Sequence, residues 1–462
     1  HTAFVSAPSC TPSRAALYTG RHFFRNGSHS QLHHPWQKGA PDPFDQVRGM
    51  PNLLADGGYH VGWSHKWHMR VDLIGGKQNQ YNTRGERINR FSQVVTRAGN
   101  RERPKRAILS EVRNNFRDFL EARPADAPFF YSFNPTNTHR PWVQGSGKEL
   151  WGIEPDDLAG KLPKFLPDNP TIREDFADYL GEVLAFDAAC GVIIAELEQR
   201  GELDNTLVVV TGDHGIPGFP RGKCNVYDFG ARVSLAMRLP GRIEVGRKVE
   251  KPVSLIDLAP TFLDAAGAAP EKGTNGESLL PAIAAGGSDE QLRGWALIGR
   301  ETHVGDCRLG GLPYPVRAIR TADALYVVNF KPERGPMANE PLSARFEPAM
   351  RGQGENEYRA MDIDHGPTLY WFLDREGDPA IAGSWRLGFG LRPAEELYDV
   401  RNDPDQMVDL AADPEWQAIR KELRQRLFDE LEANNDPRLD DKFDRPPYNI
   451  HTGIGADRNA AG

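Results

Sequence analysis

The residues best suited to chemistry stand near the start of the chain, in the sequence SCTPSR over residues 9–14. A proline inside this run and Gly20 beyond it predict a short helix over residues 13–19. Cys10 then stands at the mouth of the helix N-terminus, and Arg14 lies one turn in. Free backbone N–H groups, the positive end of the helix dipole and a guanidinium attract anions there. The run predicts an anion site beside a cysteine; the alternative is a capped helix with an incidental cysteine.

A second candidate is the pair Asp213 and His214, which follows the run TLVVVT over residues 206–211. This β-branched run predicts a strand buried on both faces of a parallel sheet. Side chains just beyond the carboxyl end of such a strand face the usual ligand crevice of an open α/β sheet. A turn with an N-capping aspartate is the alternative.

The elements that must position these residues alternate between helix and strand. Helical patterns cover residues 49–56, 107–121 and 171–199, and extended runs cover 59–63 and 129–133. This alternation predicts an α/β layered fold.

The composition changes after residue 266, where a stretch rich in Gly, Ala, Pro and Ser over 267–288 is typical of a linker or domain boundary. Beyond it lie strand candidates and a closing helix, at 295–299, 316–321, 324–330, 394–399 and 414–433. We therefore expect a catalytic domain over 1–285 and a smaller α+β domain over 286–462, with a loosely held tail over 436–462.

Composition excludes several classes of protein. The 462 residues carry a net charge of −8, so no global basic field favours nucleic acid. The sequence holds no run of eighteen apolar residues, which a membrane-spanning helix needs. The four cysteines are too scattered for a disulfide framework or a CxxC metal site.

The complete run from Ser9 to Arg21, with Thr19-Gly20 after the helix, resembles the signature of the type I sulfatases, Cys-x-Pro-Ser-Arg followed by Thr-Gly. The resemblance implies the fold of the alkaline phosphatase-like superfamily: a sandwich with a large mixed, mostly parallel sheet between helices, plus a C-terminal antiparallel sheet. It also implies a partner, the enzyme that oxidises this cysteine to formylglycine (3-oxoalanine). A cysteine has no second hydroxyl, so the unmodified side chain could not complete the family's turnover.

Further segments resemble the family in the same order along the chain. Lys66-Trp67-His68 is similar to its Gly-Lys-Trp-His segment, although Ser64-His65 departs from the usual pair before the lysine. The resemblance places Lys66 on the sulfate and His68 beside the formylglycine. His139, in a His-x-Pro loop, and Lys223 would meet the leaving group and the sulfate. Read alone, each of these would be an ordinary loop or strand-end residue.

The resemblance makes Asp213 and His214 metal ligands. We expect calcium, a hard cation that prefers oxygen ligands. The imidazole of His214 leaves manganese open, because borderline ions accept nitrogen. In this chemistry Arg14, the two lysines and the cation neutralise the sulfate oxygens.

Several later segments look closest to the sulfamidase (heparan N-sulfatase) branch. They predict hydrolysis of a sulfate ester or sulfamate on a sulfated sugar derived from glycosaminoglycan. Glu301, His303 and Arg317 are the candidate substrate contacts from the C-terminal domain. Packing and turn chemistry of that domain is the alternative explanation of these segments.

Two other functions stay open. A phosphonate monoester or phosphodiester hydrolase shares the superfamily fold and the modified cysteine. An inactive glycan-binding pseudoenzyme is the second, because the tandem aspartates that sulfatases carry before the cysteine motif do not precede Cys10. We expect from this an N-terminally truncated chain with a weakened cation site and little activity. The family is periplasmic, secreted or lysosomal, and a homodimer remains open.

Overall fold

The structure is a computed structural model that describes residues 2–29, 44–303, 307–308, 312–337, 362–446 and 448. Its helices are α1 (Cys10–Thr19), α2 (Met50–Asp56), α3 (Phe91–Val95), α4 (Glu102–Ala122), α5 (Ser146–Trp151), α6 (Pro170–Gln199), α7 (Asp228–Ala231), α8 (Leu258–Ala265), α9 (Leu280–Ile283), α10 (Pro367–Leu373), α11 (Ala382–Phe389) and α12 (Gln417–Ala433). Its strands are β1 (Ala3–Phe4), β2 (His60–His65), β3 (Phe129–Asn134), β4 (Val208–Thr211), β5 (Arg232–Val233), β6 (Leu235–Arg238), β7 (Val253–Ser254), β8 (Trp295–Arg300), β9 (Val316–Thr321), β10 (Ala324–Asn329) and β11 (Glu395–Asp399).

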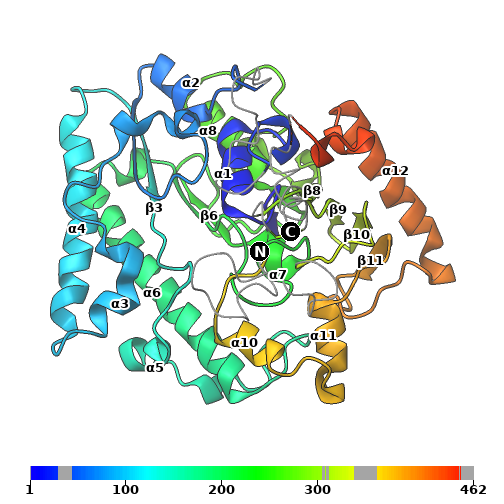
Figure 1. Cartoon of the computed structure of the whole chain (residues 1–462). Coiled ribbons are helices and arrows are strands. Elements are labelled where there is room, and N and C mark those ends of the chain that lie inside the picture. The colour runs from blue at the N-terminus through cyan, green and yellow to red at the C-terminus, as the bar shows by residue number, and fades with distance from the viewer. Residues whose placement is uncertain are drawn as a thin grey trace, which may run out of the picture.

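Strands β2 and β3 pair in parallel and carry helices on both faces. On one face the rings of Phe116 and Phe119 in α4 lie 4.9 and 4.8 Å from the ring of Tyr131. On the other face Val61 and Trp63 pack in one cluster with side chains of α1, α2 and α8. Burying apolar side chains on both faces of a sheet gives a helix–sheet–helix sandwich. The long helices α4 and α6 form its outer wall on the left of Figure 1.

The C-terminal sheet has the strand order β11-β10-β9-β8, and every neighbouring pair is antiparallel. One face packs against β1, β5 and β7 in a shared apolar cluster. The other face is covered by α12, whose Leu423, Leu427 and Leu431 are buried. In Figure 1 α12 lies along the outer side of this sheet. The expected fold class, a mixed α/β sandwich with a separate antiparallel sheet, is confirmed.

The prediction of a strand buried on both faces over 206–211 is wrong in two respects. β4 pairs with β6, and the pairing is antiparallel. All four of its residues are only half-buried. The physical reason is a cavity of about 750 Å³, whose lining includes residues of both β3 and β4.

Two expectations about irregular segments also need correction. Residues 267–288 contain the helix α9, whose Leu280 and Ile283 lie in the apolar core, so this segment is not purely a linker. The tail is not loose where it is described, because Arg438 and Phe443 are almost fully buried. Its residues beyond 448 lie outside the described part of the chain.

Candidate active site

Cys10 is the first residue of α1 and is buried, with 1% of its surface exposed. Its Sγ lies 3.2 Å from Nε2 of His214. The other ring nitrogen of His214, Nδ1, lies 2.7 Å from the backbone oxygen of Gly215. A protonated Nδ1 that donates to this carbonyl leaves Nε2 facing the sulfur. The motif at the start of α1 and the residues after β4 therefore meet, although about two hundred residues separate them in the sequence.

Asp213 ties three segments together. Its Oδ2 accepts from Nη1 of Arg14 at 3.3 Å and from Nζ of Lys66 at 3.2 Å. Arg14 also donates to the backbone oxygens of Lys66 and Trp67. One guanidinium thus connects α1, the segment after β2 and the segment after β4. Three positive groups were predicted to bind the sulfate: the N-terminus of α1, Arg14 and Lys66. All three converge near Cys10.

These charges shift the acidities of the two acidic groups. Burial alone would raise the pKa of the Cys10 thiol, but Lys66, Lys223 and His214 outweigh burial and hold that pKa well below its ordinary value. Burial would also raise the pKa of Asp213, and the neighbouring Lys66 is the main cause of its net lowering. A cysteine with a depressed pKa in a cationic environment differs from an inert, buried structural cysteine.

A second cluster lies on the other side of Cys10 and is built around Lys223. Its Nζ lies 3.0 Å from Nε2 of His139 and 3.1 Å from Oδ1 of Asp364. Asp364 is also 3.3 Å from Nε2 of His139. The lysine side chain is 3% exposed, whereas the imidazole is 31% and the carboxylate 16% exposed. We call His139, Lys223 and Asp364 the leaving-group cluster, after the role that resemblance gives its first member.

The charges within the leaving-group cluster stabilise one another. Burial would lower the pKa of Lys223, but Asp364 and Cys10 raise it above its ordinary value. Burial would raise the pKa of Asp364, but Lys223 and His139 lower it. The lysine is therefore held as a cation and the aspartate as an anion.

The loop that carries His139 is fixed by a buried ion pair. Arg140 donates from Nη1 and Nη2 to the two carboxylate oxygens of Asp175 in α6, at 2.9 and 2.6 Å. Its Nε donates to the backbone oxygen of Pro217 at 3.0 Å. Thr368 at the start of α10 donates to the same aspartate. Bidentate pairs of this kind fix geometry as well as charge. Sequence patterns gave no indication of Asp175.

His68 is the one residue of the sulfate-side prediction that is not joined to the others. Its backbone has a positive φ of 42°. Its Nδ1 is buried without a hydrogen-bond partner. Among the described residues no hydrogen bond links it to Cys10. The structure therefore places it beside Lys66 in the chain with an uncommitted ring nitrogen.

The structure does not bring Glu301 and Arg317 to this site. Arg317 donates to Glu301 at 2.8 Å and to Asp436 at 2.7 Å, and all three side chains have no exposed surface. Arg438 donates to the same glutamate. We call Glu301, Arg317, Asp436 and Arg438 the C-terminal ion-pair network. Its charges are satisfied internally, which leaves none facing a cleft.

His303 lies behind the leaving-group cluster. Its Nδ1 is 3.6 Å from Oδ1 of Asp362, and its side chain is 6% exposed. Burial would lower the pKa of His303, but Cys224 and Asp362 raise it to about 10. This histidine is therefore a buried cation close to Lys223, with Asp362 as its acidic partner.

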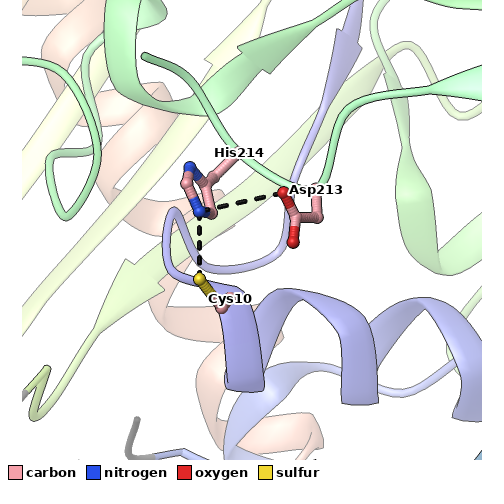
Figure 2. A group of neighbouring side chains, drawn as sticks. All are labelled: Cys10, Asp213 and His214. Atoms are coloured by element: carbon pink, nitrogen blue, oxygen red, sulfur yellow. Dashed lines mark hydrogen bonds and ion pairs between the residues drawn. The ribbon is translucent and has the colours of Figure 1, made fainter. Parts of the chain in front are cut away.

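Among the described residues, Cys10, Asp213 and His214 form a group that could hold a metal ion, and their ligand atoms all lie within 4.8 Å of one another (Figure 2). Calcium takes six to eight oxygen ligands. Oδ2 of Asp213 is already bonded to Arg14 and Lys66, so Oδ1, which lies 3.8 Å from Nε2 of His214, is the carboxylate oxygen that Asp213 could offer to an ion here. A nitrogen, a sulfur and one oxygen suit a borderline ion better. These residues alone do not fit calcium.

Asp364 is the functional candidate that the sequence did not reveal. It lies in the segment Asp362-Ile363-Asp364-His365-Gly366, just before α10. Two acids and a histidine before a helix are a weak signal, because such residues often cap helices. Its place beside His139 and Lys223 results from tertiary packing of a segment more than 140 residues away from either.

Comparison with known proteins gives matches over both parts of the chain. A family model described as Sulfatase matches residues 1–268. The human N-sulphoglucosamine sulphohydrolase is 28% identical over 94% of this chain and 83% of its own length. A solved structure of a protein in complex with its substrate, D-glucosamine-2-N,6-O-disulfate, covers 96% of this chain and 91% of that one, with a TM-score of 0.61 and 19% identity. The phosphonate monoester hydrolase of Agrobacterium radiobacter covers 94% and 88%, with a TM-score of 0.59 and 17% identity.

Proposed function

The chain belongs to the sulfatase family, and from this premise we propose that it hydrolyses the sulfamate or sulfate ester of a sulfated amino sugar of the glycosaminoglycan type. The observation that carries the proposal is the convergence of Arg14, Lys66 and Lys223 on Cys10 at a helix N-terminus. Such a site binds a tetrahedral anion. The human relative, named for N-sulphoglucosamine, supports the choice of sugar.

The nucleophile is proposed to derive from Cys10. Sulfatases use a formylglycine and a divalent metal, and a formylglycine hydrate at this position would supply an oxygen nucleophile. Its site fits, because position 10 lies among cations at the start of α1. Lys66 and Arg14 would bind the sulfate oxygens through charge-assisted hydrogen bonds, and Asp213 would hold both cations in place. Asp213 and His214 are the proposed metal ligands.

Protons move on two sides of the bound sulfate in this proposal. His139 and Lys223 would donate to the leaving atom, because they share a hydrogen bond and the imidazole is partly open to solvent. His68, with its uncommitted Nδ1, is the proposed proton acceptor on the nucleophile's side. The proposed catalytic domain over 1–285 and C-terminal domain over 286–462 would both contribute, since Asp364 belongs to the second.

Location and partners follow the family. No helix among the described residues is long and apolar enough to cross a bilayer. We propose a periplasmic, secreted or lysosomal enzyme, whose partners are the sulfated sugar and the enzyme that generates formylglycine. A homodimer is compatible with this proposal.

The experiment has two parts. Mass spectrometry of the peptide containing Cys10, from protein made alongside the modifying enzyme, should show formylglycine; a peptide that stays wholly cysteine contradicts the proposed nucleophile. The modified protein is then offered glucosamine N-sulfate, glucosamine 6-O-sulfate, an aryl sulfate and a phosphonate monoester. Preference for a sulfated sugar is expected. Preference for the phosphonate would instead favour the hydrolase whose fold is similar.

A further inference from the structure

The carboxylate of Asp364 is a negative charge on the side of the site where a leaving group would be protonated. It pairs with Nζ of Lys223 at 3.1 Å and lies 3.3 Å from Nε2 of His139. The side chain is 16% exposed, unlike the fully enclosed carboxylates of the C-terminal ion-pair network. Asp364 can therefore meet the atom to which His139 and Lys223 deliver a proton.

A carboxylate at this place is unfavourable for the cleavage of a sulfate ester. The leaving oxygen of an ester gathers negative charge as the S–O bond breaks, and a nearby carboxylate repels that charge. The nitrogen of a sulfamate behaves oppositely, because it must gain a proton and a positive charge before the N–S bond breaks. The same carboxylate attracts that charge.

The two overall reactions balance differently. A sulfamate and water, R–NH–SO₃⁻ and H₂O, give an ammonium and sulfate, R–NH₃⁺ and SO₄²⁻; the N–S electron pair goes to nitrogen, and a bond from oxygen to sulfur forms. An ester, R–O–SO₃⁻, and water give a neutral alcohol, sulfate and a free proton. The sulfamate product alone keeps a cation where the scissile bond was.

Proton donation by Lys223 increases this difference between the sulfamate and the ester. When the lysine passes a proton to an ester oxygen, the product alcohol is neutral, so the positive charge 3.0 Å from Asp364 leaves the cluster. When the proton passes to a sulfamate nitrogen, the positive charge stays within the cluster on the new ammonium. Leaving a buried charge without a partner is costly.

We propose that Asp364 is a specificity-determining residue that favours cleavage of sulfamates over sulfate esters. This inference rests on the proposed function, in which the leaving group faces His139 and Lys223. A neighbouring charge within 4–6 Å shifts a protonation equilibrium by about 1–3 pKa units. The expected preference contributed by Asp364 is therefore about tenfold or more.

The test measures kcat/KM for glucosamine N-sulfate and glucosamine 6-O-sulfate with the formylglycine-bearing protein. D364N should lower the ratio of N-sulfate to O-sulfate activity by about tenfold or more. D364E, which keeps the charge, should largely preserve the ratio. D374N makes the same substitution at an exposed aspartate just after α10 and should leave both rates unchanged.

A second measurement needs no variant. The product glucosamine, a cation, should inhibit the wild-type protein about tenfold or more tightly than the neutral N-acetylglucosamine, because only the first can pair with Asp364. Equal inhibition by the two sugars, or an unchanged ratio in D364N, overturns the inference and leaves the proposed function standing. A wild-type protein that cleaves neither sulfated sugar overturns both.

Discussion

The candidate active site and the C-terminal ion-pair network use the same residue types, yet they differ in how their charges are satisfied. In the network Arg317 and Arg438 share Glu301, and Asp436 completes the set with no exposed surface. In the site Arg14 and Lys66 share a single oxygen of Asp213, whose side chain is 25% exposed. In the network every charge is paired with another buried charge, as in a structural ion pair. The site gathers Arg14, Lys66 and Lys223 near Cys10 and has an opening toward solvent, as the binding of an external anion requires.

This contrast teaches that the partners of a charged residue, rather than its type, separate a binding group from a structural one. Buried charges are tolerated only when they are paired and hydrogen-bonded. A buried cation whose partners are incomplete needs an anion from elsewhere. Removing a charge or the nucleophile from the site should therefore change activity, whereas removing a charge from the network should change stability.

The largest effect is expected for C10A, which removes the precursor of the nucleophile. Hydrolysis of the sulfated sugar should fall by about 10⁴-fold or more, as when other enzymes lose a nucleophile. Folding should change little, and circular dichroism with thermal unfolding checks this. The control is C190A, at a half-buried cysteine of α6 whose pKa is raised to about 12 by burial. Activity retained by C10A would remove position 10 from the chemistry.

R317M tests the network and should act on stability alone. Breaking a buried ion pair by removing one partner costs about 3–5 kcal/mol, because Glu301 and Asp436 would keep buried charges with fewer partners. Urea unfolding measures this loss, and kcat/KM per folded molecule should stay near the wild-type value. R84M breaks an exposed pair with Asp118 and should cost far less stability than R317M. A selective loss of substrate affinity in folded R317M would instead return this arginine to the list of substrate contacts.

K66A tests the site in the opposite way, with a large effect on rate and a small one on stability. Losing one donor to the transferring group should lower kcat/KM by about 10²–10³-fold. The matched control is K331A, since Lys331 also pairs with an aspartate, Asp441, at 2.8 Å. K331A should leave the rate unchanged and cost about 1 kcal/mol at most. Equal rate losses in the two variants would mean that Lys66 contributes no more to catalysis than a surface lysine paired with an aspartate.

The sequence was most informative where chemistry and local structure coincide. Cys10 and Arg14 share one helix, and Asp213 and His214 follow one strand. Residue order alone therefore predicted that the two members of each pair lie close together. Asp364 and Asp175 were not predictable in this way, because they reach the site through packing of α10 and α6. Glu301 and Arg317 were proposed as substrate contacts because their segments resemble the sulfamidase branch. Only their three-dimensional partners reveal the closed network.

The helices and strands followed the same rule. Helical spacing predicted the centres of α4, α6 and α12, and short apolar runs predicted β3 and β9. The parallel pairing expected for β4 was wrong, because a run of apolar residues carries no information about strand direction. The buried part of the tail was also missed, since Arg438 looks like a surface residue until Glu301 is placed beside it.

The smallest effect is expected at Glu182, which supports the loop that carries His139, and it concerns how stability depends on pH. Glu182 of α6 accepts hydrogen bonds from the backbone N–H of Ser92 and from Nδ2 of Asn137, two residues before His139. Burial raises the pKa of Glu182 to about 7, from an ordinary value of 4.5. The folded protein therefore holds this proton more tightly than the unfolded chain. Its contribution to stability is full below pH 4.5 and is lost as the pH rises through 7.

E182Q keeps a neutral side chain at every pH, so it should remove this dependence. Relative to E182Q, the wild type should lose about 3 kcal/mol of unfolding free energy between pH 5 and pH 8. Urea unfolding across this range measures the difference, and E198Q, at an exposed glutamate of the same helix, should run parallel to the wild type. Curves for E182Q and wild type that stay parallel would show that Glu182 keeps its charge state on folding. The pH sensitivity of the site's support would then have to come from the charged groups nearer Cys10.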